Sequence, residues 1–435
     1  MKKTVFILTR IDMLLVGYTF LRIPVLDRLI ASTHTSKLIA GLAFGLYSAA
    51  GAAGMPLRGG LVDYFENRKP IVVALVLITI LGTLLIISID GRLGLLLGMS
   101  IAGLGSMGVY PVGYVLISDL TKPKYRATAY SLRAIVNGLG QGIVAVYSVI
   151  IGINLGIYKA AFAYIATLLI FLGLYLLIGS NIPPAKGRKK PKIKNRLKIL
   201  RSNPLDRILM YFVLIYAIPR GAIQVRSITY FVESRGVTET MASVIFGISA
   251  VPAFLSFPIV LLIDRIYDER RLRIRPISAA VSIAAFAYLF AKFFSFPYYR
   301  SGEVSNRVDI ALELVLKRLS SDAYFLSIMT YAFLAFLLAG IVGPMKNGIL
   351  ADGNLPEYRG ILYSSLSVID TLSRGLGASV TGFLAVRYSL QKALEIIPLV
   401  FRIPSAVIMI LTIRPFYRSY KEVSEEIKKR LNGSR

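Results

Sequence analysis

The sequence predicts an all-α membrane protein, with twelve transmembrane helices arranged as two pseudo-symmetric six-helix bundles. The first observation is composition, because the 435-residue chain is 55% hydrophobic and only 17% charged, with a mean hydropathy of +0.66. A chain of this composition is expected to be dissolved mostly in lipid rather than folded as a soluble domain. The second observation is a set of twelve long apolar runs, and the third is a repeat that relates the two halves of the chain.

The apolar runs have the length of membrane-spanning helices. A helix needs about 20 mostly apolar residues to cross a hydrocarbon core of roughly 30 Å. Lys2 and Lys3 precede the first run as they would in a signal peptide, but Arg10 and Asp12 interrupt it, so we expect it to form the first helix. The twelve expected spans are 5–30, 38–57, 70–89, 93–118, 127–152, 158–181, 207–231, 240–263, 276–296, 323–350, 359–385 and 393–413.

The basic residues predict the orientation of these spans. The chain has 51 Lys and Arg against 23 Asp and Glu, a formal net charge of +28. When successive gaps are assigned to alternate sides of the membrane, 32 basic residues fall on the side of the two termini, 12 on the other side and seven within the spans. Because basic loops remain in the cytoplasm, we expect both termini of this cell-membrane protein to be cytoplasmic.

Charge and polarity also divide the chain into segments. We expect an N-terminal six-helix bundle at 1–181, a basic cytoplasmic linker at 182–206, a C-terminal bundle at 207–414 and a cytoplasmic tail at 415–435. The linker is interpreted as a solvated charge run beside anionic lipid headgroups, with nucleic acid as the remote alternative. The polar insertion 297–321 contains an amphipathic pattern, which predicts a short external helix at the membrane face, with a disordered loop as the alternative.

An internal repeat relates the two bundles. Shifting the sequence by 233 residues places Pro111–Gly142 on Pro344–Gly375, with identical residues at nine positions. The identical pairs are Pro111/Pro344, Asp119/Asp352, Pro123/Pro356, Tyr125/Tyr358, Arg126/Arg359, Tyr130/Tyr363, Ser131/Ser364, Leu139/Leu372 and Gly142/Gly375. Duplicated six-helix halves with a site between them are typical of transporters, whereas a channel or an intramembrane enzyme needs no such duplication.

The segment after the second span resembles the signature of the major facilitator superfamily, roughly G-x-x-x-D-R-x-G-N-R-K. The matching residues are Gly59, Asp63, Asn67, Arg68 and Lys69, whereas Tyr64 and Glu66 stand in place of the signature's Arg and Gly. The second half keeps Asp264 and Arg265, and the Pro-x-Tyr-Arg segment that ends at Arg126 is similar to the family's loop after helix 4. The resemblance covers the whole chain and implies a secondary transporter, a symporter or antiporter, whose two halves rock about a central site.

The charged residues at these helix junctions predict a gate. A carboxylate such as Asp63 or Asp264 can cap a helix N-terminus across the pseudo-twofold axis, where the helix dipole favours negative charge. Arg68 and Lys69 can pair with Asp119, and such contacts would hold one side closed and break in the other state. Positive charges that only set the topology are the alternative. The expected gate residues are Asp63, Arg68, Lys69, Asp119, Arg126, Asp264, Arg265, Asp352 and Arg359.

Seven arginines and three aspartates lie within the apolar spans, more than two residues from either end. They are Arg10, Arg22, Arg133, Arg220, Arg226, Arg374 and Arg402, with Asp12, Asp27 and Asp370. An ionisable group near the bilayer centre is costly and by default marks a functional pathway. We expect Arg10, Asp12 and Arg226 to lie toward the membrane interfaces, and Arg402 to have a structural role.

Equivalent helices of the two halves carry polar pairs at similar depth. At about 1.5 Å per residue from the start of its helix, Arg133 lies about 10 Å deep, Asn137 about 16 Å and Gln141 about 22 Å. The repeat places Asp370 at the position of Asn137 and Arg374 at that of Gln141. Each pair is spaced i, i+4 and shares one helix face. An Asp370–Arg374 pair that only neutralises itself between packed helices is the alternative.

Arg220 is a second candidate, because Pro219 and Gly221 flank it about 21 Å from the start of its helix. These two residue types interrupt a helix, which is tolerated where the backbone lines a cavity. With Arg22, the expected substrate-binding residues are Arg22, Arg133, Asn137, Gln141, Arg220, Asp370 and Arg374. Their excess positive charge predicts a small organic or phosphorylated anion as substrate, since Arg binds carboxylate and phosphate through paired hydrogen bonds.

Several kinds of chemistry are excluded. The chain has no Cys and a single His, His34, which we assign to a surface loop, so thiolate catalysis, a catalytic triad and a Cys/His metal site are not expected. No Walker motif occurs, and we expect neither an enzyme nor a cofactor. Asp27 and Asp370 are the candidates for carrying a coupling proton, although neighbouring arginines favour their charged form. Facilitated diffusion and anion exchange remain open.

Two rival interpretations remain. A multidrug efflux transporter of the same fold is favoured by Tyr18, Tyr110 and Tyr114. However, the drug/proton antiporters of the family that the chain resembles usually carry an Arg in helix 4, where this chain has Met99. A non-transporting membrane receptor or scaffold would be supported by a large soluble domain, whereas the tail is a short charged helix. We expect a monomer in the lipid bilayer, with a small-molecule substrate, protons as a candidate coupling ion and no nucleic-acid partner.

Overall fold

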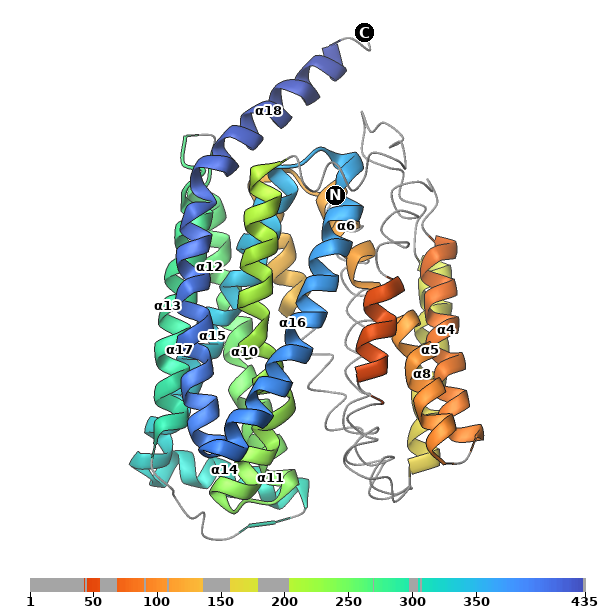
Figure 1. The fold of residues 1–435 in the computed structure, drawn as a ribbon, viewed down its shortest axis with the longest axis vertical. Helices are drawn as coiled ribbons and strands as arrows, with labels where there is room; N and C mark the ends of the chain where they lie inside the picture. The colour runs from red at the N-terminus through yellow and green to blue at the C-terminus, as the bar shows by residue number, and fades with distance from the viewer. Residues whose placement is uncertain are drawn as a thin grey trace. The chain divides into compact units, whose positions relative to one another are not determined.

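A computed structural model describes about three quarters of the chain, and within these residues every regular element is a helix (Figure 1). The described residues are 43, 45–54, 69–89, 91–107, 109–135, 157–178, 203–268, 270–296, 304–305 and 307–432. They belong to two compact units. Unit 1 is drawn from Met1–Arg207, Asn347–Leu372 and Arg414–Arg435, and unit 2 from Ile208–Lys346 and Ser373–Ile413.

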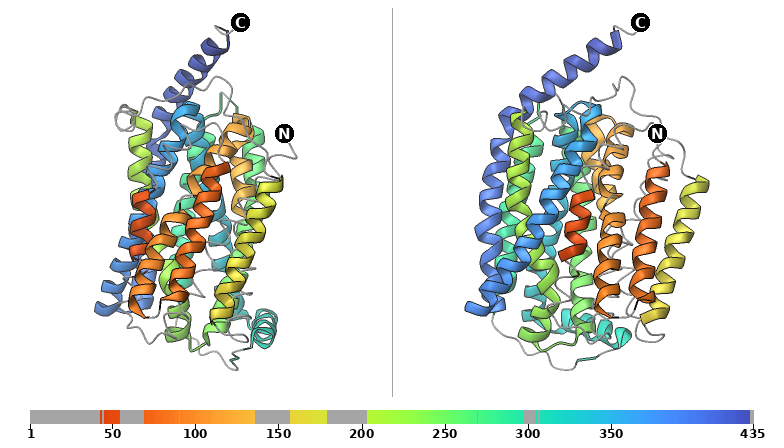
Figure 2. Two further views of the ribbon diagram at one scale, coloured as in Figure 1. Left: turned by 90° about the vertical axis from the view of Figure 1, so that its right-hand side faces the viewer. Right: turned by 45° about the vertical axis from the view of Figure 1, so that its right-hand side comes forward.

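The described helices of the first half fall on the expected spans. They are α4 (Lys69–Ser88), α5 (Arg92–Met107), α6 (Val109–Leu120) and α8 (Ile157–Ile178), and the 3₁₀ turn η1 (Pro123–Tyr125) follows α6. Gly91, with φ of +84°, makes the tight turn that lets α5 return along α4. Both views of Figure 2 place the yellow α8 beside the orange α4.

The second half is described almost completely. Its elements are α10 (Pro204–Arg235), α11 (Glu239–Ala250), α12 (Pro252–Ile266), α13 (Ile274–Ser295), α14 (Val308–Ser321), α15 (Ala323–Asp352), η3 (Pro356–Tyr358), α16 (Arg359–Arg387), α17 (Leu390–Leu411) and α18 (Ile413–Asn432). The expected span 240–263 is divided into α11 and α12 at Val251, because Pro252 lacks a backbone N–H and begins a new helix.

Four described helices are long and apolar enough to cross a membrane. They are Pro70–Ser88, Ile274–Ser295, Ala323–Asp352 and Leu390–Leu411. The expected span 5–30 lies outside the described residues, as do parts of 38–57 and 127–152.

The internal repeat is confirmed in the backbone. The turns η1 and η3 lie 233 residues apart and have the same form. Lys122 and Leu355, which precede them, both have φ −62° and ψ 146°, and each turn begins with Pro at its first position. Proline fixes φ and disfavours the helical region for the residue before it, so the repeated Pro enforces the same break between two helices in each half.

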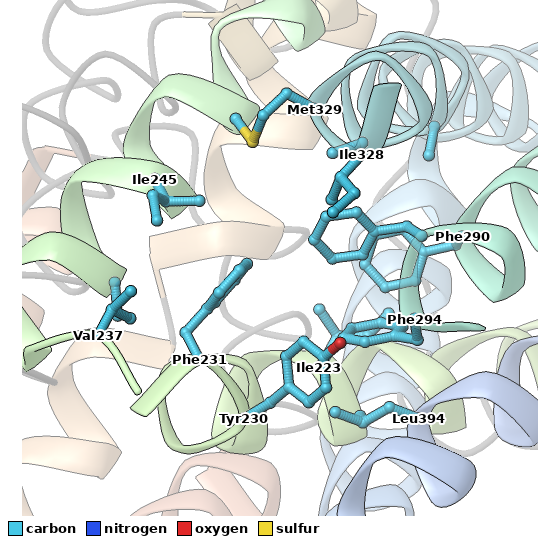
Figure 3. Packing of buried hydrophobic residues seen from close by; sticks show 14 of the residues in the cluster. Ile223, Tyr230, Phe231, Val237, Ile245, Phe290, Phe294, Ile328, Met329 and Leu394 are labelled. Atoms are coloured by element: carbon cyan, nitrogen blue, oxygen red, sulfur yellow. The ribbon is translucent and has the colours of Figure 1, made fainter. Parts of the chain in front are cut away.

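The core of unit 2 is a cluster of buried aromatic and aliphatic side chains (Figure 3). Phe290 and Phe294 meet edge to face at 4.9 Å between ring centroids, and Tyr230 meets Phe294 at the same distance. The amphipathic helix expected in the insertion is confirmed as α14, whose Ala311 and Val315 are buried in this core while its other face is exposed. The insertion is thus attached to the bundle through the small apolar face of a helix.

Two glycines let α10 and α16 cross closely within unit 2. A Cβ atom added at Gly221 would collide with the backbone carbonyl of Arg374, and one added at Gly377 would collide with the carbonyl of Ile218. A backbone obstacle cannot rotate away as a side chain does. The Gly of the Pro219-Arg220-Gly221 segment is therefore required by helix packing.

We expect Gly221→Ala and Gly377→Ala each to lower the free energy of unfolding by about 1–3 kcal/mol, because a methyl group would force the two helices apart. Gly375→Ala is the matched control, since it lies on the same helix with no atom within 4 Å of its added Cβ. Alanine is the better helix former, so the control should be neutral or up to about 1 kcal/mol more stable. Thermal unfolding in detergent measures all three, and equal Tm values for Gly377→Ala and Gly375→Ala would contradict this packing.

Candidate functional site

Two ion pairs in unit 1 join the first half of the sequence to the second. Arg126 pairs with Asp352, and Arg359 pairs with Asp119 at 3.6 Å. The partners are equivalent residues of the repeat, so each arginine meets the aspartate of the other half. All four side chains are nearly inaccessible to solvent. We call these four residues the crossed ion-pair cluster.

Helix ends supply the remaining acceptors of the cluster. The carbonyl of Ala351, in the last turn of α15, accepts a hydrogen bond from Arg126 Nη1 at 3.3 Å and from Arg359 Nε at 3.0 Å. Arg126 Nε also donates to the carbonyl of Thr121, directly after α6, at 3.2 Å. The last carbonyls of a helix lack partners within the helix and carry its negative dipole end. The two arginines therefore stabilise the helix ends as well as the aspartates.

A tyrosine pair lies one turn into the helices that follow the cluster. The hydroxyl groups of Tyr130 and Tyr363 are 2.6 Å apart and buried. Tyr130 is also in position to donate to the carbonyl of Tyr114 at 3.2 Å, and Tyr363 to that of Asn347 at 3.0 Å. Two hydroxyl hydrogens cannot satisfy three contacts at once. The pair thus has two equivalent arrangements, related by the repeat, in which one carbonyl contact lacks its hydrogen.

Arg133 lies beside the tyrosine pair. Its guanidinium carbon is 3.9 Å from the ring centroid of Tyr114, whose ring stacks on Tyr363 with 5.2 Å between centroids and 18° between planes. Arg133 is 3% exposed. The structure therefore brings this expected substrate-binding residue together with the aromatic layer that adjoins the expected gate.

The tail helix α18 contacts the same region from the C-terminal end of the chain. Arg430 donates to Glu357 of η3 at 2.8 Å, and Glu357 is 2% exposed. Asn354 donates to Asp206 at 2.9 Å, which ties the beginning of α10 to the segment before η3. Phe416 of α18 is fully buried. The turn that carries Arg359 is thus held on several sides within unit 1.

Asp264 and Arg265 also belong to the expected gate. Asp264 is fully buried and pairs with Arg275 at 2.9 Å, and this guanidinium group lies 3.6 Å from the ring centroid of Tyr267. This partner is on the next helix of the same half, and the helix cap across the pseudo-twofold axis stays a prediction. Arg265 is exposed.

The remaining expected site residues are only partly described. Arg220 is exposed on α10, and Asp370 and Arg374 are half-buried on α16. Within unit 2 the α10–α16 crossing places Gly221, next to Arg220, against the backbone of Arg374. Lys69 begins α4, and its side chain is not described. Arg22, Asp27, Asp63, Arg68, Asn137 and Gln141 lie outside the described residues.

Comparison with known proteins decides the family. The model of the Major Facilitator Superfamily matches residues 13–304. The chain belongs to this superfamily. Its twelve-helix fold is that of superfamily transporters, and the chain is a multi-pass membrane protein.

Similar proteins agree with this assignment at low identity. An uncharacterized transporter of Buchnera aphidicola subsp. Schizaphis graminum (strain Sg) is 28% identical over 170 residues, 38% of this chain and 42% of that protein, so the match spans less than half of the relative's length. The human organic anion transporter MFSD10 has a TM-score of 0.64 at 13% identity, over 94% of this chain and 99% of that one. The proton:xylose symporter XylE has a TM-score of 0.69 at 14% identity, over 94% and 95%. Such identities show a common fold.

Sequence reasoning missed two features of this superfamily member. Tyr130 and Tyr363 were identified as a repeated pair but were given no role. The contact of Arg430 with Glu357 was not expected, although the repeat carried a signal for it, because Glu357 occupies the position of Lys124. A reversed charge inside a repeat indicates that one copy has acquired a separate partner.

We expect Arg126→Gln to loosen the cluster by removing its pair with Asp352. The chain has no Cys, so Ser364→Cys, at a fully buried position beside Tyr363, is a single reporter of opening. Loss of about 1.4 kcal/mol from the closed arrangement should raise the thiol labelling rate about tenfold. Arg418→Gln is the control, because Arg418 forms an exposed pair with Glu422 that contributes little. Equal labelling rates in the two variants would show that the cluster does not hold this end closed.

Asp206 predicts a pH dependence of stability. It lies before the expected span 207–231, and burial raises its pKa from 3.8 to about 7, while hydrogen bonds from Asn354 and Asn203 oppose the rise. Between about pH 4 and pH 7 the folded protein keeps the proton of Asp206, whereas the unfolded chain releases it. The free energy of unfolding should therefore fall as the pH rises through this range, by up to ~1.4 kcal/mol per pH unit, and become constant above about pH 7. Asp206→Asn should remove this loss.

The measurement is the Tm in detergent at pH 5 and pH 8 for the wild type, Asp206→Asn and Glu422→Gln. Glu422 is exposed and serves as the control for loss of one carboxylate. The wild type and Glu422→Gln should lose stability between the two pH values by similar amounts, and Asp206→Asn by less. The same loss in Asp206→Asn would assign the pH dependence to other groups.

Proposed function

We propose that the chain is a secondary transporter that moves a small organic anion across the cell membrane by alternating access. The observation that carries this proposal is the crossed ion-pair cluster, because it joins the two halves through equivalent residues. Both termini would lie in the cytoplasm, as the distribution of basic loops predicts. The cluster would then be a cytoplasmic gate in its closed form.

The energetics of the cluster suit a gate. Burying a carboxylate and a guanidinium costs several kcal/mol of lost hydration for each ion, which their mutual attraction only approximately offsets. When the halves separate, the pairs break but the four charges regain water. The closed and open forms can therefore differ by a small free energy, which a bound substrate is able to overcome.

The charge of the expected central residues supports an anionic substrate. Of the expected central residues that the structure describes, three are arginines (Arg133, Arg220 and Arg374) and one is an acid (Asp370). A guanidinium fork binds carboxylate or phosphate in two parallel hydrogen bonds. MFSD10 is described as an organic anion transporter and XylE as a proton:xylose symporter, so the fold is compatible with more than one substrate class. The preference for an anion rests on the arginines of this chain.

Asp370 is our candidate for carrying a coupling proton. It lies on α16 one turn before Arg374. The two residues are spaced i, i+4 and share one helix face, so a substrate anion that binds Arg374 would lie close to this carboxylate. This proximity would couple proton binding to substrate binding.

The test is uptake into proteoliposomes of a panel of carboxylates and phosphate esters, with and without a pH gradient. We expect at least one anion to accumulate in response to the gradient, whereas neutral sugars should not. Asp370→Asn should abolish accumulation and retain exchange. Asp309→Asn, at an exposed position of α14, is the control. Uptake limited to neutral or cationic compounds would refute an anionic substrate, and unchanged accumulation in Asp370→Asn would exclude it as the proton carrier.

A further inference from the structure

Arg402 is a buried cation in the middle of α17. It lies about 13 Å from the end of that helix at about 1.5 Å per residue, and it is 4% exposed. Among the described residues no carboxylate forms an ion pair with it, and its Nε has no hydrogen-bond acceptor. The sequence analysis assigned this residue a structural role, but a structural arginine in a membrane helix normally has an acceptor for its charge.

Two aromatic rings of unit 2 enclose the guanidinium group. Its central carbon lies 3.7 Å from the ring centroid of Tyr216 on α10 and 4.8 Å from that of Phe286 on α13. Ring faces attract a cation, but each such contact offsets only part of the cost of removing the charge from water. The N–H donors lie at the edge of the planar guanidinium, where a ring face makes no strong hydrogen bond. The rings therefore hold the group in place and leave its donors for another acceptor.

A second arginine lies beside this arrangement. Arg220 follows Tyr216 by four residues on α10, so the two residues lie on the same face of that helix. Arg220 is exposed, whereas Arg402 is buried. Two cations of like charge raise the free energy of each other unless an anion lies within reach of both.

We propose that Arg402 and Arg220 form an anion-binding site between α10, α13 and α17 (Figure 1), with Tyr216 and Phe286 as its walls. The ligand is the carboxylate or phosphate group of an organic anion, held by Arg402 from the buried side and by Arg220 from the exposed side. The inference deepens the proposed function by adding a specificity residue from a helix outside the expected central set. It also gives Arg220 a partner within unit 2.

The absence of Trp from the chain allows a local reporter. Phe286→Trp would place a single indole beside Arg402, and Tyr288→Trp, two residues away at an exposed position, is the matched control. Both are titrated in neutral detergent with sodium succinate and with inorganic phosphate, at ionic strength kept constant with chloride. We expect a saturable change of emission in Phe286→Trp and none in Tyr288→Trp.

Substitution of the arginine identifies the group that binds. In the Phe286→Trp background, Arg402→Gln should raise the apparent Kd about tenfold or more, the usual effect of losing a charge-assisted hydrogen bond. Arg402→Lys should have an intermediate Kd, because it keeps the charge without the fork. Lys292→Gln removes an exposed cation of the same unit and should leave the Kd unchanged. An unchanged Kd in Arg402→Gln would overturn the proposal.

A measurement without Trp protects the test against misfolding of the reporter. The Tm of the wild type should rise with succinate or phosphate, and that of Arg402→Gln should not. Phosphatidylglycerol is added separately to detect a lipid headgroup as the source of the phosphate. A response to phosphatidylglycerol alone would overturn the assignment to a soluble organic anion.

Uptake separates this inference from the proposed function. If an anion is transported, Arg402→Gln should raise the KM for that anion about tenfold with little change in kcat. The reason is that the variant loses binding energy that is the same in the ground state and the transition state. Equal KM values for the wild type and Arg402→Gln would refute the anion-binding site and leave the proposal of transport intact. Binding to the Phe286→Trp protein that depends on Arg402, without uptake of any anion, would refute transport and leave the site intact.

Discussion

A buried guanidinium group is stable only beside groups that replace its water, and the arginines of unit 1 and unit 2 meet this constraint differently. Arg126 and Arg359 contact aspartates and helix-end carbonyls in place of water, and these contacts connect the helix ends. Arg275 uses a buried aspartate and the face of Tyr267. Arg402 uses ring faces. The ion pairs of Arg126 and Arg359 therefore connect the two halves of the sequence, and the pair of Arg275 connects two neighbouring helices. The ring contacts of Arg402 leave its N–H donors available for another acceptor.

The internal repeat of the sequence explains why Arg126 and Arg359 form crossed ion pairs. Each repeat provides an aspartate at the end of one helix and an arginine at the start of the next, with a Pro-initiated turn between them. A local pair within each repeat would stabilise that repeat alone. Because the repeats are equivalent, the contact of Arg126 with the second half is matched by a contact of Arg359 with the first. The Tyr130 and Tyr363 hydroxyls, which are also equivalent in the repeat, share one hydrogen bond.

The family and the repeat were predictable because they depend on local properties of the sequence. Apolar length indicates a span, and Pro, Asp and Arg at fixed spacing indicate the turn between two spans. Partner choice was not predictable. Asp264 was correctly placed at a helix junction, yet its pairing with Arg275 depends on the geometry of a short connection. For Arg402, sequence spacing does not show which rings and charges from other helices surround its side chain.

The repeat is also broken in a way that makes the two turns unequal. Position 124 is Lys in the first turn and the equivalent 357 is Glu in the second, where the partly exposed Arg430 of α18 binds the buried glutamate. Only the second turn is therefore tied to the tail helix by this pair. Arg359 follows that turn directly, so any motion that separates Arg359 from Asp119 must either carry α18 along or break the pair of Arg430 with Glu357. Because a buried glutamate without its cation is costly, we expect the tail helix to stay with the second turn in any such motion.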